Sequence, residues 1–401
     1  MRRVAITGAG MISPGGRTLA ESWHAVREGR WLLRPASAGY ADTADLLVAE
    51  VRDFDAEAHF ERRQLTTLDL VAQFAVIAAR EAVAMAGIDI AHTPAERTRC
   101  IVGSGTGGER THDEASRRVY GEGAARLHPM TVPRIMLSGA ASHVALDRKI
   151  MGGVFAVSSA CASAAHAVGQ AFADIRSGTV DVAIAGGSEA CLSHGCMKGW
   201  QALHILSDNG CRPFSLGRRG VVLGEGAAMF VLEAYDIAAA RGADILAELI
   251  GFGMSSDAGS ITAPDAGGMA RAMIGALGDA GISADAVDHV NAHGTGTQAN
   301  DVTECAALHL VFGDRLPRIP VTANKSVLGH ALGASGAFEL AMSVMSLREQ
   351  ILPCTAHFET PDPACPIDCI PHASRDADVS TILSNSFAFG GLNASLLVQR
   401  V

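Results

Sequence analysis

The chain has 401 residues, which is more than one ordinary domain needs and is typical of two domains or two fused halves. Hydrophobic residues make up 48% and charged residues 18%, so a large core can form and a disordered or linker-type protein is excluded. The net charge of −10 argues against a non-specific nucleic-acid binder, because phosphate binding needs a net basic face.

Short apolar runs that end in Gly or Ser recur along the chain, and each predicts a buried strand that enters a tight loop. In chain order they are 4–10, 100–108, 154–161, 180–190, 227–234, 287–297, 319–326 and 381–391. Ala-rich stretches with helical spacing lie between many of them, at 68–88, 162–178, 304–313 and 334–350. Strands that alternate with helices predict an α/β protein whose sheets are covered on both faces.

Two strand–loop–helix units, 154–178 and 287–313, are weakly alike and suggest a pseudo-repeat. We therefore expect an N-terminal half, 1–250, and a C-terminal half, 251–401, that pack together, since no Pro/Ser-rich linker separates them. The more polar segment 107–135 predicts a surface excursion or an oligomer contact.

The nine cysteines are scattered without C-x-x-C spacing, so we expect no structural zinc, no disulfide scaffold and a reduced, cytoplasmic setting. The N-terminus lacks the apolar region of a signal peptide. No apolar run reaches ~18 residues, so we expect no membrane span.

Cys161 is the first candidate for chemistry. It follows the apolar run 154–160 and precedes a helical pattern, so its thiol is expected at a strand-to-helix junction. Backbone N–H groups and the dipole at a helix N-terminus stabilise a thiolate, which is a nucleophile. The alternative is an inert buried cysteine, which is a common role.

Two histidines strengthen this interpretation. His293 in NAHGTGT and His330 in VLGHALG each follow a predicted strand and lie among glycines. Ligands approach the backbone at such strand-end loops, although each histidine alone could be a turn residue bonded to backbone groups. Together with Cys161 they form a set of one nucleophile and two imidazoles.

Polar residues accompany the histidines. Lys325 lies five residues before His330, and Asp301 and Glu304 follow His293. A lysine beside imidazoles keeps them neutral, and an acid at the start of a helix can fix a histidine tautomer. A Lys–Glu pair that only joins the two halves is the alternative.

The loop GSGTGG places Gly103, Gly105 and Gly108 in G-x-G-x-x-G spacing after a predicted strand. The polar segment that follows lacks the apolar pattern of a Rossmann helix, and no acid ends a second strand about 20 residues on. We therefore interpret these glycines as tight turns in an active-site wall, and we expect no cofactor.

Four segments in the same order resemble the β-ketoacyl-ACP synthases, and the likeness runs along essentially the whole chain. They are SSACASAAHA around Cys161, NAHGTGTQANDVTE around His293, NKSVLGHALGASGA around His330, and SNSFAFGGLNASL near the end. The match is to the elongating, synthase II-like branch. Within it, GWQALHILSDNGCRPFS is closer to nodulation-type ketosynthases and those of reducing type II polyketide systems.

The resemblance implies a thiolase-like fold with five α/β/α/β/α layers and two similar halves, and a dimer. It implies that Cys161 accepts an acyl chain from acyl carrier protein (ACP). Malonyl-ACP then loses CO2, and its enolate attacks the thioester to give a β-ketoacyl-ACP. His293 and His330 would donate N–H groups to the enolate oxygen, and Lys325 would help to set the protonation of His330. Asp301 and Glu304 would support these groups from behind.

The same resemblance assigns Phe389 a backbone N–H at the second oxyanion, beside that of Cys161, and a gating role that Phe387 shares. Ala388 departs from the glycine usual between these two phenylalanines, and its Cβ predicts a stiffer gate. Thr106, in the loop that would close the acyl pocket, hints at room for a longer or unsaturated chain.

The acidic carrier protein would need a local basic patch on this acidic chain. By position Arg62, Arg63 and Arg126 are the docking candidates, with solvated surface charges as the alternative. The assembly would be a homodimer, or a heterodimer in which this chain is the active half beside a chain-length partner.

Three rival functions fit less well. A degradative thiolase or an initiating synthase would use a second Cys or an Asn in place of one histidine. A non-catalytic chain-length subunit would lack the nucleophilic Cys161. A nucleotide-binding oxidoreductase has only the single glycine match.

Overall fold

The computed structural model describes residues 1–37 and 42–401, and no helix among them is both long and apolar enough to cross a membrane. Ten strands form one mixed sheet in the order β11-β10-β14-β15-β9-β1-β8-β6-β4-β5. These strands are β1 (Val4–Ile12), β4 (Thr98–Gly103), β5 (Gly153–Val157), β6 (Val182–Glu189), β8 (Gly226–Ala234), β9 (Ala247–Ser256), β10 (His289–Asn291), β11 (Val321–Thr322), β14 (Thr381–Ala388) and β15 (Leu392–Gln399). Shorter strands form two small sheets: β2 (Arg34–Pro35), β3 (Leu47–Ala49) and β7 (Leu223–Gly224), then β12 (Ile351–Leu352) and β13 (Arg375–Asp376).

The large sheet consists of two five-stranded halves with one pairing pattern. From its outer edge inward, β5, β4 and β6 pair in parallel, and β8 and β1 continue antiparallel. In the other half β11, β10 and β14 pair in parallel, and β15 and β9 continue antiparallel. The halves meet where β1 pairs with β9. Two similar halves are therefore present, but the predicted pairing of 154–178 with 287–313 is wrong, because the edge strand β5 corresponds to the edge strand β11 and β10 corresponds to β4. The expected boundary at residue 250 falls inside β9, which starts the second half at Ala247.

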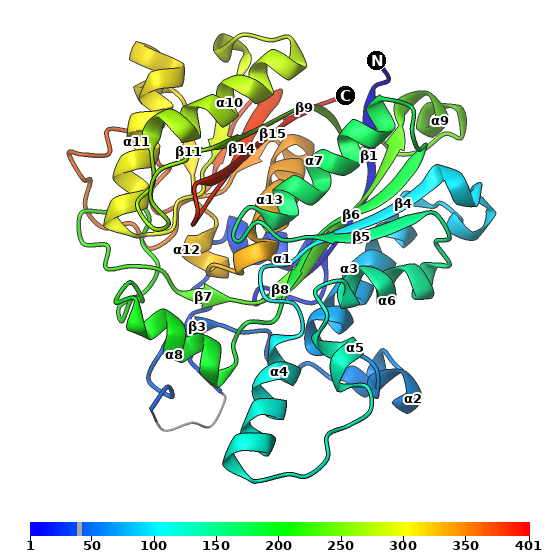
Figure 1. The fold of residues 1–401 in the computed structure, drawn as a ribbon. Helices are drawn as coiled ribbons and strands as arrows, with labels where there is room; N and C mark the ends of the chain where they lie inside the picture. The colour runs from blue at the N-terminus through cyan, green and yellow to red at the C-terminus, as the bar shows by residue number, and fades with distance from the viewer. Residues whose placement is uncertain (38–41) are drawn as a thin grey trace.

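Helices cover both outer faces of the sheet and fill the space between its halves (Figure 1). Helices α3 and α6 pack on the first half, α10 and α11 on the second, and α7 and α13 lie between them, which gives the five expected layers. The helices are α1 (Leu19–Arg27), α2 (Arg62–Leu65), α3 (Leu70–Ala86), α4 (Glu109–Ser116), α5 (Thr131–Ile135), α6 (Gly139–Arg148), α7 (Ser163–Arg176), α8 (His194–Ala202), α9 (Tyr235–Ala240), α10 (Ala266–Ala280), α11 (Gln298–Phe312), α12 (Lys325–Leu328) and α13 (Ser335–Glu349).

Small residues let the layers approach closely. Helix α3 begins at Asp69, whose side chain accepts from the Val71 N–H, and ends at Gly87, whose φ of 60° is the left-handed cap that favours glycine. A Cβ added at Gly8 of β1 would lie 2.0 Å from the Ala82 carbonyl oxygen of α3, so only glycine fits. The high glycine and alanine content therefore sets the spacing at which strand ends converge on the site.

Candidate active site

Cys161 lies in the turn between β5 and α7, the strand-to-helix junction that its sequence context predicts. The preceding Ala160 has a φ of 49°, a left-handed conformation that costs a non-Gly residue of order 1–3 kcal/mol. Ser163 braces the turn, because its hydroxyl accepts from the Ser159 N–H at 2.9 Å and donates to the Ala160 carbonyl at 2.7 Å. The turn leaves the Cys161 side chain 6% exposed, at the end of a cavity.

His330 is held against the Cys161 thiol from the opposite side. Its backbone N–H donates to the Val222 carbonyl at 2.7 Å, and its own carbonyl accepts from the Gly224 N–H at 2.8 Å. Its Nε2 lies 3.1 Å from the Cys161 sulfur, and its Nδ1 lies 2.8 Å from the Ser335 hydroxyl at the start of α13. A hydroxyl can donate or accept, so Ser335 is compatible with either neutral tautomer of His330.

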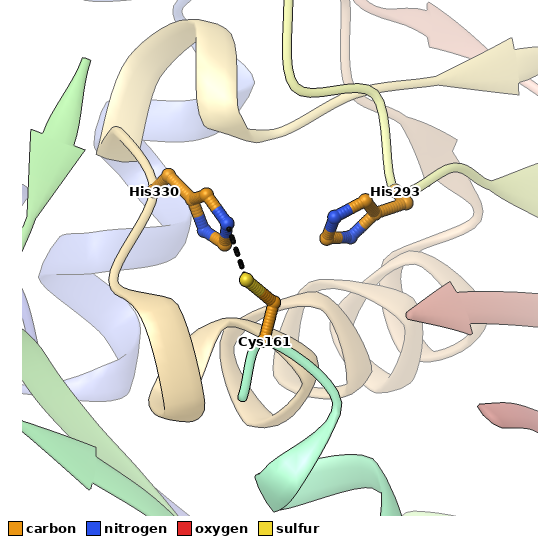
Figure 2. Close-up of side chains that lie close together, drawn as sticks. All are labelled: Cys161, His293 and His330. Atoms are coloured by element: carbon orange, nitrogen blue, oxygen red, sulfur yellow. Dashed lines mark hydrogen bonds between the residues drawn. The ribbon is translucent and has the colours of Figure 1, made fainter. Parts of the chain in front are cut away.

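His293 completes the group from the loop between β10 and α11. Its ring centroid lies 5.4 Å from that of His330, with the ring planes at 83°. The ring of Phe387 contacts it edge-on, with centroids 6.3 Å apart. Figure 2 shows Cys161, His293 and His330 pointing toward one another from three separate segments, and one functional atom from each lies within 4.8 Å of the others.

Lys325 fixes the tautomer of His293. Its ammonium lies 3.2 Å from His293 Nδ1, donates to the His293 carbonyl at 2.5 Å, and forms an ion pair with Glu339 of α13. An ammonium group can only donate, so Nδ1 accepts and the ring proton of His293 is on Nε2. Lys325 therefore contacts His293 directly and acts on His330, whose protonation it is expected to influence, through its charge.

The site holds its imidazoles neutral. Burial, followed by the charge of Lys325, lowers the pKa of both His293 and His330. Burial raises the pKa of the Cys161 thiol to about 12, although Lys325 and the backbone N–H of Phe389 act in the opposite direction. The site therefore holds a neutral thiol rather than the thiolate expected at a helix N-terminus, beside neutral imidazoles, one of which can receive its proton.

Asp301 and Glu304 organise the backbone of the His293 loop. Glu304 accepts from the N–H groups of His293 and Gly294, both at 2.8 Å, while Asp301 accepts from the Gly296 N–H at 3.2 Å. Among the described residues neither carboxylate bonds to an imidazole. The expectation that an acid fixes a histidine tautomer is therefore wrong. The group that fixes the tautomer of His293 is the Lys325 ammonium.

Thr106 does not line the cavity at Cys161 in the described part of the chain. Its hydroxyl and backbone N–H both donate to the buried Glu189, at 2.7 and 3.1 Å. Glu189 also accepts from the Gly333 N–H at 2.9 Å, so it ties the Thr106 loop to the loop after His330. The structure thus gives Thr106 a place behind the catalytic loops rather than on the cavity wall.

The three arginines proposed for docking are exposed. Arg62 and Arg63 lie on α2, and Arg126 lies between α4 and α5. Arg62 is 3.7 Å from Glu57, and no ion pair within the described residues involves Arg63 or Arg126. All three are therefore free of buried structural roles and open to a partner.

The cavity that reaches Cys161 has a volume of about 290 Å³. Trp200, Leu203 and Ile205 form an apolar part of its wall, and Thr295 and Thr297 add hydroxyl groups. Sequence reasoning did not single out Trp200 or Ser335. Trp200 lies in GWQALHILSDNGCRPFS, the segment that resembles the nodulation-type ketosynthases, and no local pattern marks its ring as functional. Ser335 is an ordinary small residue at the start of α13.

The chain matches two family descriptions in succession. Residues 1–238 match "Beta-ketoacyl synthase, N-terminal domain" and residues 246–359 match "Beta-ketoacyl synthase, C-terminal domain". It is 42% identical over 401 residues to nodulation protein E of Rhizobium meliloti (strain 1021), with both chains covered in full. It is 37% identical over 407 residues to 3-oxoacyl-[acyl-carrier-protein] synthase 2 of Staphylococcus aureus (strain COL), covering 100% of this chain and 98% of that one.

Solved structures give the same result. The ishigamide ketosynthase/chain length factor superposes with a TM-score of 0.94 at 35% identity, covering 100% of this chain and 99% of that one. A type II polyketide ketosynthase bound to its acyl-carrier protein and a hexaketide superposes with a TM-score of 0.91 at 30% identity, with both chains fully covered.

Proposed function

The chain belongs to the β-ketoacyl synthase family and is a condensing acyltransferase of the synthase II-like branch, and from this premise we propose that Cys161, His293 and His330 perform its chemistry. The observation that carries the proposal is the convergence of one thiol and two neutral imidazoles within 4.8 Å at the end of a cavity. Nucleophilic acyl transfer needs the thiol, and decarboxylation needs N–H donors at the developing enolate.

In the first half-reaction Cys161 attacks the carbonyl of acyl-ACP. The new C–S bond forms while the bond to the carrier thiol breaks, and the carrier thiol leaves with the proton that Cys161 gave up through His330 Nε2. When the acyl-Cys161 thioester is attacked in the second half-reaction, the backbone N–H groups of Cys161 and Phe389 hold the oxyanion of that tetrahedral intermediate. The Phe389 N–H acts to lower the pKa of the Cys161 thiol, as a donor at that sulfur would.

In the second half-reaction malonyl-ACP loses CO2 and the electron pair moves onto its thioester oxygen as an enolate. His293 presents Nε2–H because Lys325 occupies its Nδ1, and His330 presents Nε2–H when the Ser335 hydroxyl donates to its Nδ1. The enolate carbon then forms a C–C bond to the acyl carbonyl, and the Cys161 thiolate leaves and takes up a proton from solvent through His330 Nε2. Neutral donors favour the enolate over the ground state without protonating it first.

The test is the intact mass of the purified chain after acyl-ACP is added, followed by malonyl-ACP. We expect a gain of one acyl group on Cys161 and its discharge as β-ketoacyl-ACP. His293→Ala should keep the acylation and slow condensation about 10²–10³-fold, because one enolate donor is lost. Full condensation by His293→Ala would contradict the enolate assignment, and an unacylated wild-type Cys161 would contradict the nucleophile assignment.

The proposed carrier partner is ACP, docked by Arg62, Arg63 and Arg126. The exposure of these cations on an acidic chain supports a local basic patch. Arg62→Glu combined with Arg63→Glu should raise the KM for acyl-ACP severalfold and leave turnover of a small acyl-thioester surrogate unchanged. An equal loss with both substrates would place the defect in the site instead.

The proposed active unit combines both halves, 1–250 with Cys161 and 251–401 with His293, His330 and Phe389. The pairing of β1 with β9 and the shared helices α7 and α13 support it, because the site forms only where the halves pack. A homodimer, or a heterodimer with a chain-length partner, completes the proposal. We place the enzyme in the reducing cytoplasm, because the Cys161 thiol acts only while reduced.

A further inference from the structure

Trp200 lies in the cavity, and the condensation chemistry assigns it no role. It stands near the C-terminal end of α8, and its ring stacks on that of Phe389 with centroids 5.8 Å apart and planes at 16°. The same indole meets the His330 ring at 6.5 Å and 71°. Both separations lie in the range in which aromatic rings attract one another. One side chain therefore contacts the gate and an imidazole that touches Cys161.

Phe389 lies at the end of a strand, and its ring stacks on Trp200. The residue is 36% exposed and comes directly after the last residue of β14. Gly390 and Gly391 follow with φ of 82° and 67°, in the left-handed region where glycine is unstrained. A ring that follows a strand and precedes two glycines can turn unless a neighbour holds it, and Trp200 is the stacked neighbour in the described part of the chain.

Ala388 limits that movement on the strand side. It is the last residue of β14, pairs with Leu392 of β15, and is 9% exposed. Its Cβ removes the freedom that a glycine would have there, so rotation of the gate is confined to residues 389–391. A contact that holds the Phe389 ring therefore also fixes the Phe389 backbone N–H, which acts on the Cys161 thiol.

We propose that Trp200 is a positioning residue that holds the Phe389 ring in its present place in the cavity that reaches Cys161. The proposal deepens the gate and oxyanion roles given to Phe389 and rests on them for its effect on catalysis. The stack then has two opposite effects. It slows the access of reagents to the Cys161 thiol, and it keeps the Phe389 N–H in the position that the second half-reaction uses.

The first test does not depend on the proposed reaction. Iodoacetamide alkylates a cysteine thiolate, forming a C–S bond as iodide leaves, and peptide mass spectrometry quantifies each site. We expect Trp200→Ala to speed alkylation of Cys161 about two- to tenfold, the factor by which one aromatic pair shifts an equilibrium. Trp200→Phe keeps a ring to stack on and should restore a rate close to that of the wild type.

Two controls separate a local effect from a loosened fold. Trp31 is 44% exposed and contacts His357 outside the cavity, so Trp31→Ala removes an indole elsewhere and should leave the Cys161 rate unchanged. Cys100 on β4 is fully buried and is the internal standard within each sample. Faster alkylation of Cys161 and Cys100 together, or an equal response to Trp31→Ala, would overturn the proposal.

The second test uses the catalytic cycle. In single-turnover assays Trp200→Ala should acylate Cys161 at least as fast as the wild type and condense with malonyl-ACP about two- to tenfold more slowly. An equal change in both half-reactions would overturn the proposal. If the wild type takes no acyl group at all, the proposed function fails, while the alkylation result still decides whether Trp200 holds Phe389.

Discussion

Lys325 influences both imidazoles although it bonds to only one. It bonds to His293. Burial is the larger cause of the lowered pKa of His293 and His330, and the charge of Lys325 is the second cause. In Lys325→Met that charge is gone, so both pKa values rise toward their ordinary range. Imidazolium then forms at a higher pH, and an imidazolium can protonate the enolate rather than merely stabilise it. A protonated enolate is lost as acetyl-ACP, so we expect the acid limb of condensation to move to higher pH.

The pH dependence of β-ketoacyl-ACP formation measures this shift. Lys149 lies exposed at the end of α6, so Lys149→Met removes one cation without touching the site and should reproduce the wild-type profile. A Lys325→Met profile that is lower at every pH but has an unmoved acid limb would mean that Lys325 acts only as a structural partner of Glu339.

At the scale of elements, the buried Arg218, in the segment before β7, forms ion pairs with Asp301 of α11 and with Asp362. The Arg218 side chain is fully buried, lies 3.4 Å from Asp301 of α11, and pairs with Asp362 at 2.5 Å. Removing one partner of a buried pair leaves an uncompensated charge, so Arg218→Met should lower the free energy of unfolding by about 3–5 kcal/mol.

Denaturant unfolding tests this prediction beside an adjacent control. Arg219 pairs with Asp208, but these side chains are 62% and 74% exposed. Arg219→Met should therefore change stability by no more than about 1 kcal/mol. Equal losses in the two variants would show that the segment, rather than the buried charge network, determines the effect.

The elements differ in how far the sequence predicts them. The helical pattern at 162–178 corresponds to α7, and the apolar run before Cys161 contains β5, because amphipathic spacing and Gly boundaries are local signals. The run 319–326 contains only the two-residue strand β11, and α12 begins at Lys325. That early helix turns the ammonium toward His293 across the site. The local pattern does not show which imidazole the Lys325 ammonium contacts.

The same limit applies to the site. Both histidines and the thiol are recognisable because glycines and strand ends flank them. The stack of Trp200 on Phe389 and the bond from His330 to Ser335 join side chains through space, and no local pattern encodes either contact. Contacts of this kind come from packing, which periodicity does not describe.

At the scale of the whole molecule, the large sheet ends at the exposed edge of β5. β5 is its last strand, so one side of β5 has no partner within the described chain. Phe155 on β5 is 38% exposed, and Met151 and Leu146, shortly before it in sequence, are 76% and 74% exposed. An exposed strand edge flanked by apolar side chains is typical of an interface between subunits.

We therefore expect Phe155→Asp to convert a dimer into a monomer, because a buried, unpaired carboxylate at the interface is costly. Light scattering coupled to gel filtration measures the mass. Ile274→Asp is the matched control, since Ile274 is 54% exposed on α10, on the outer face of the other half. A wild-type chain that is monomeric alone and dimerises only when a chain-length partner is added would assign the same edge to a heterodimer. A Phe155→Asp chain that still dimerises in either setting would move the interface away from β5.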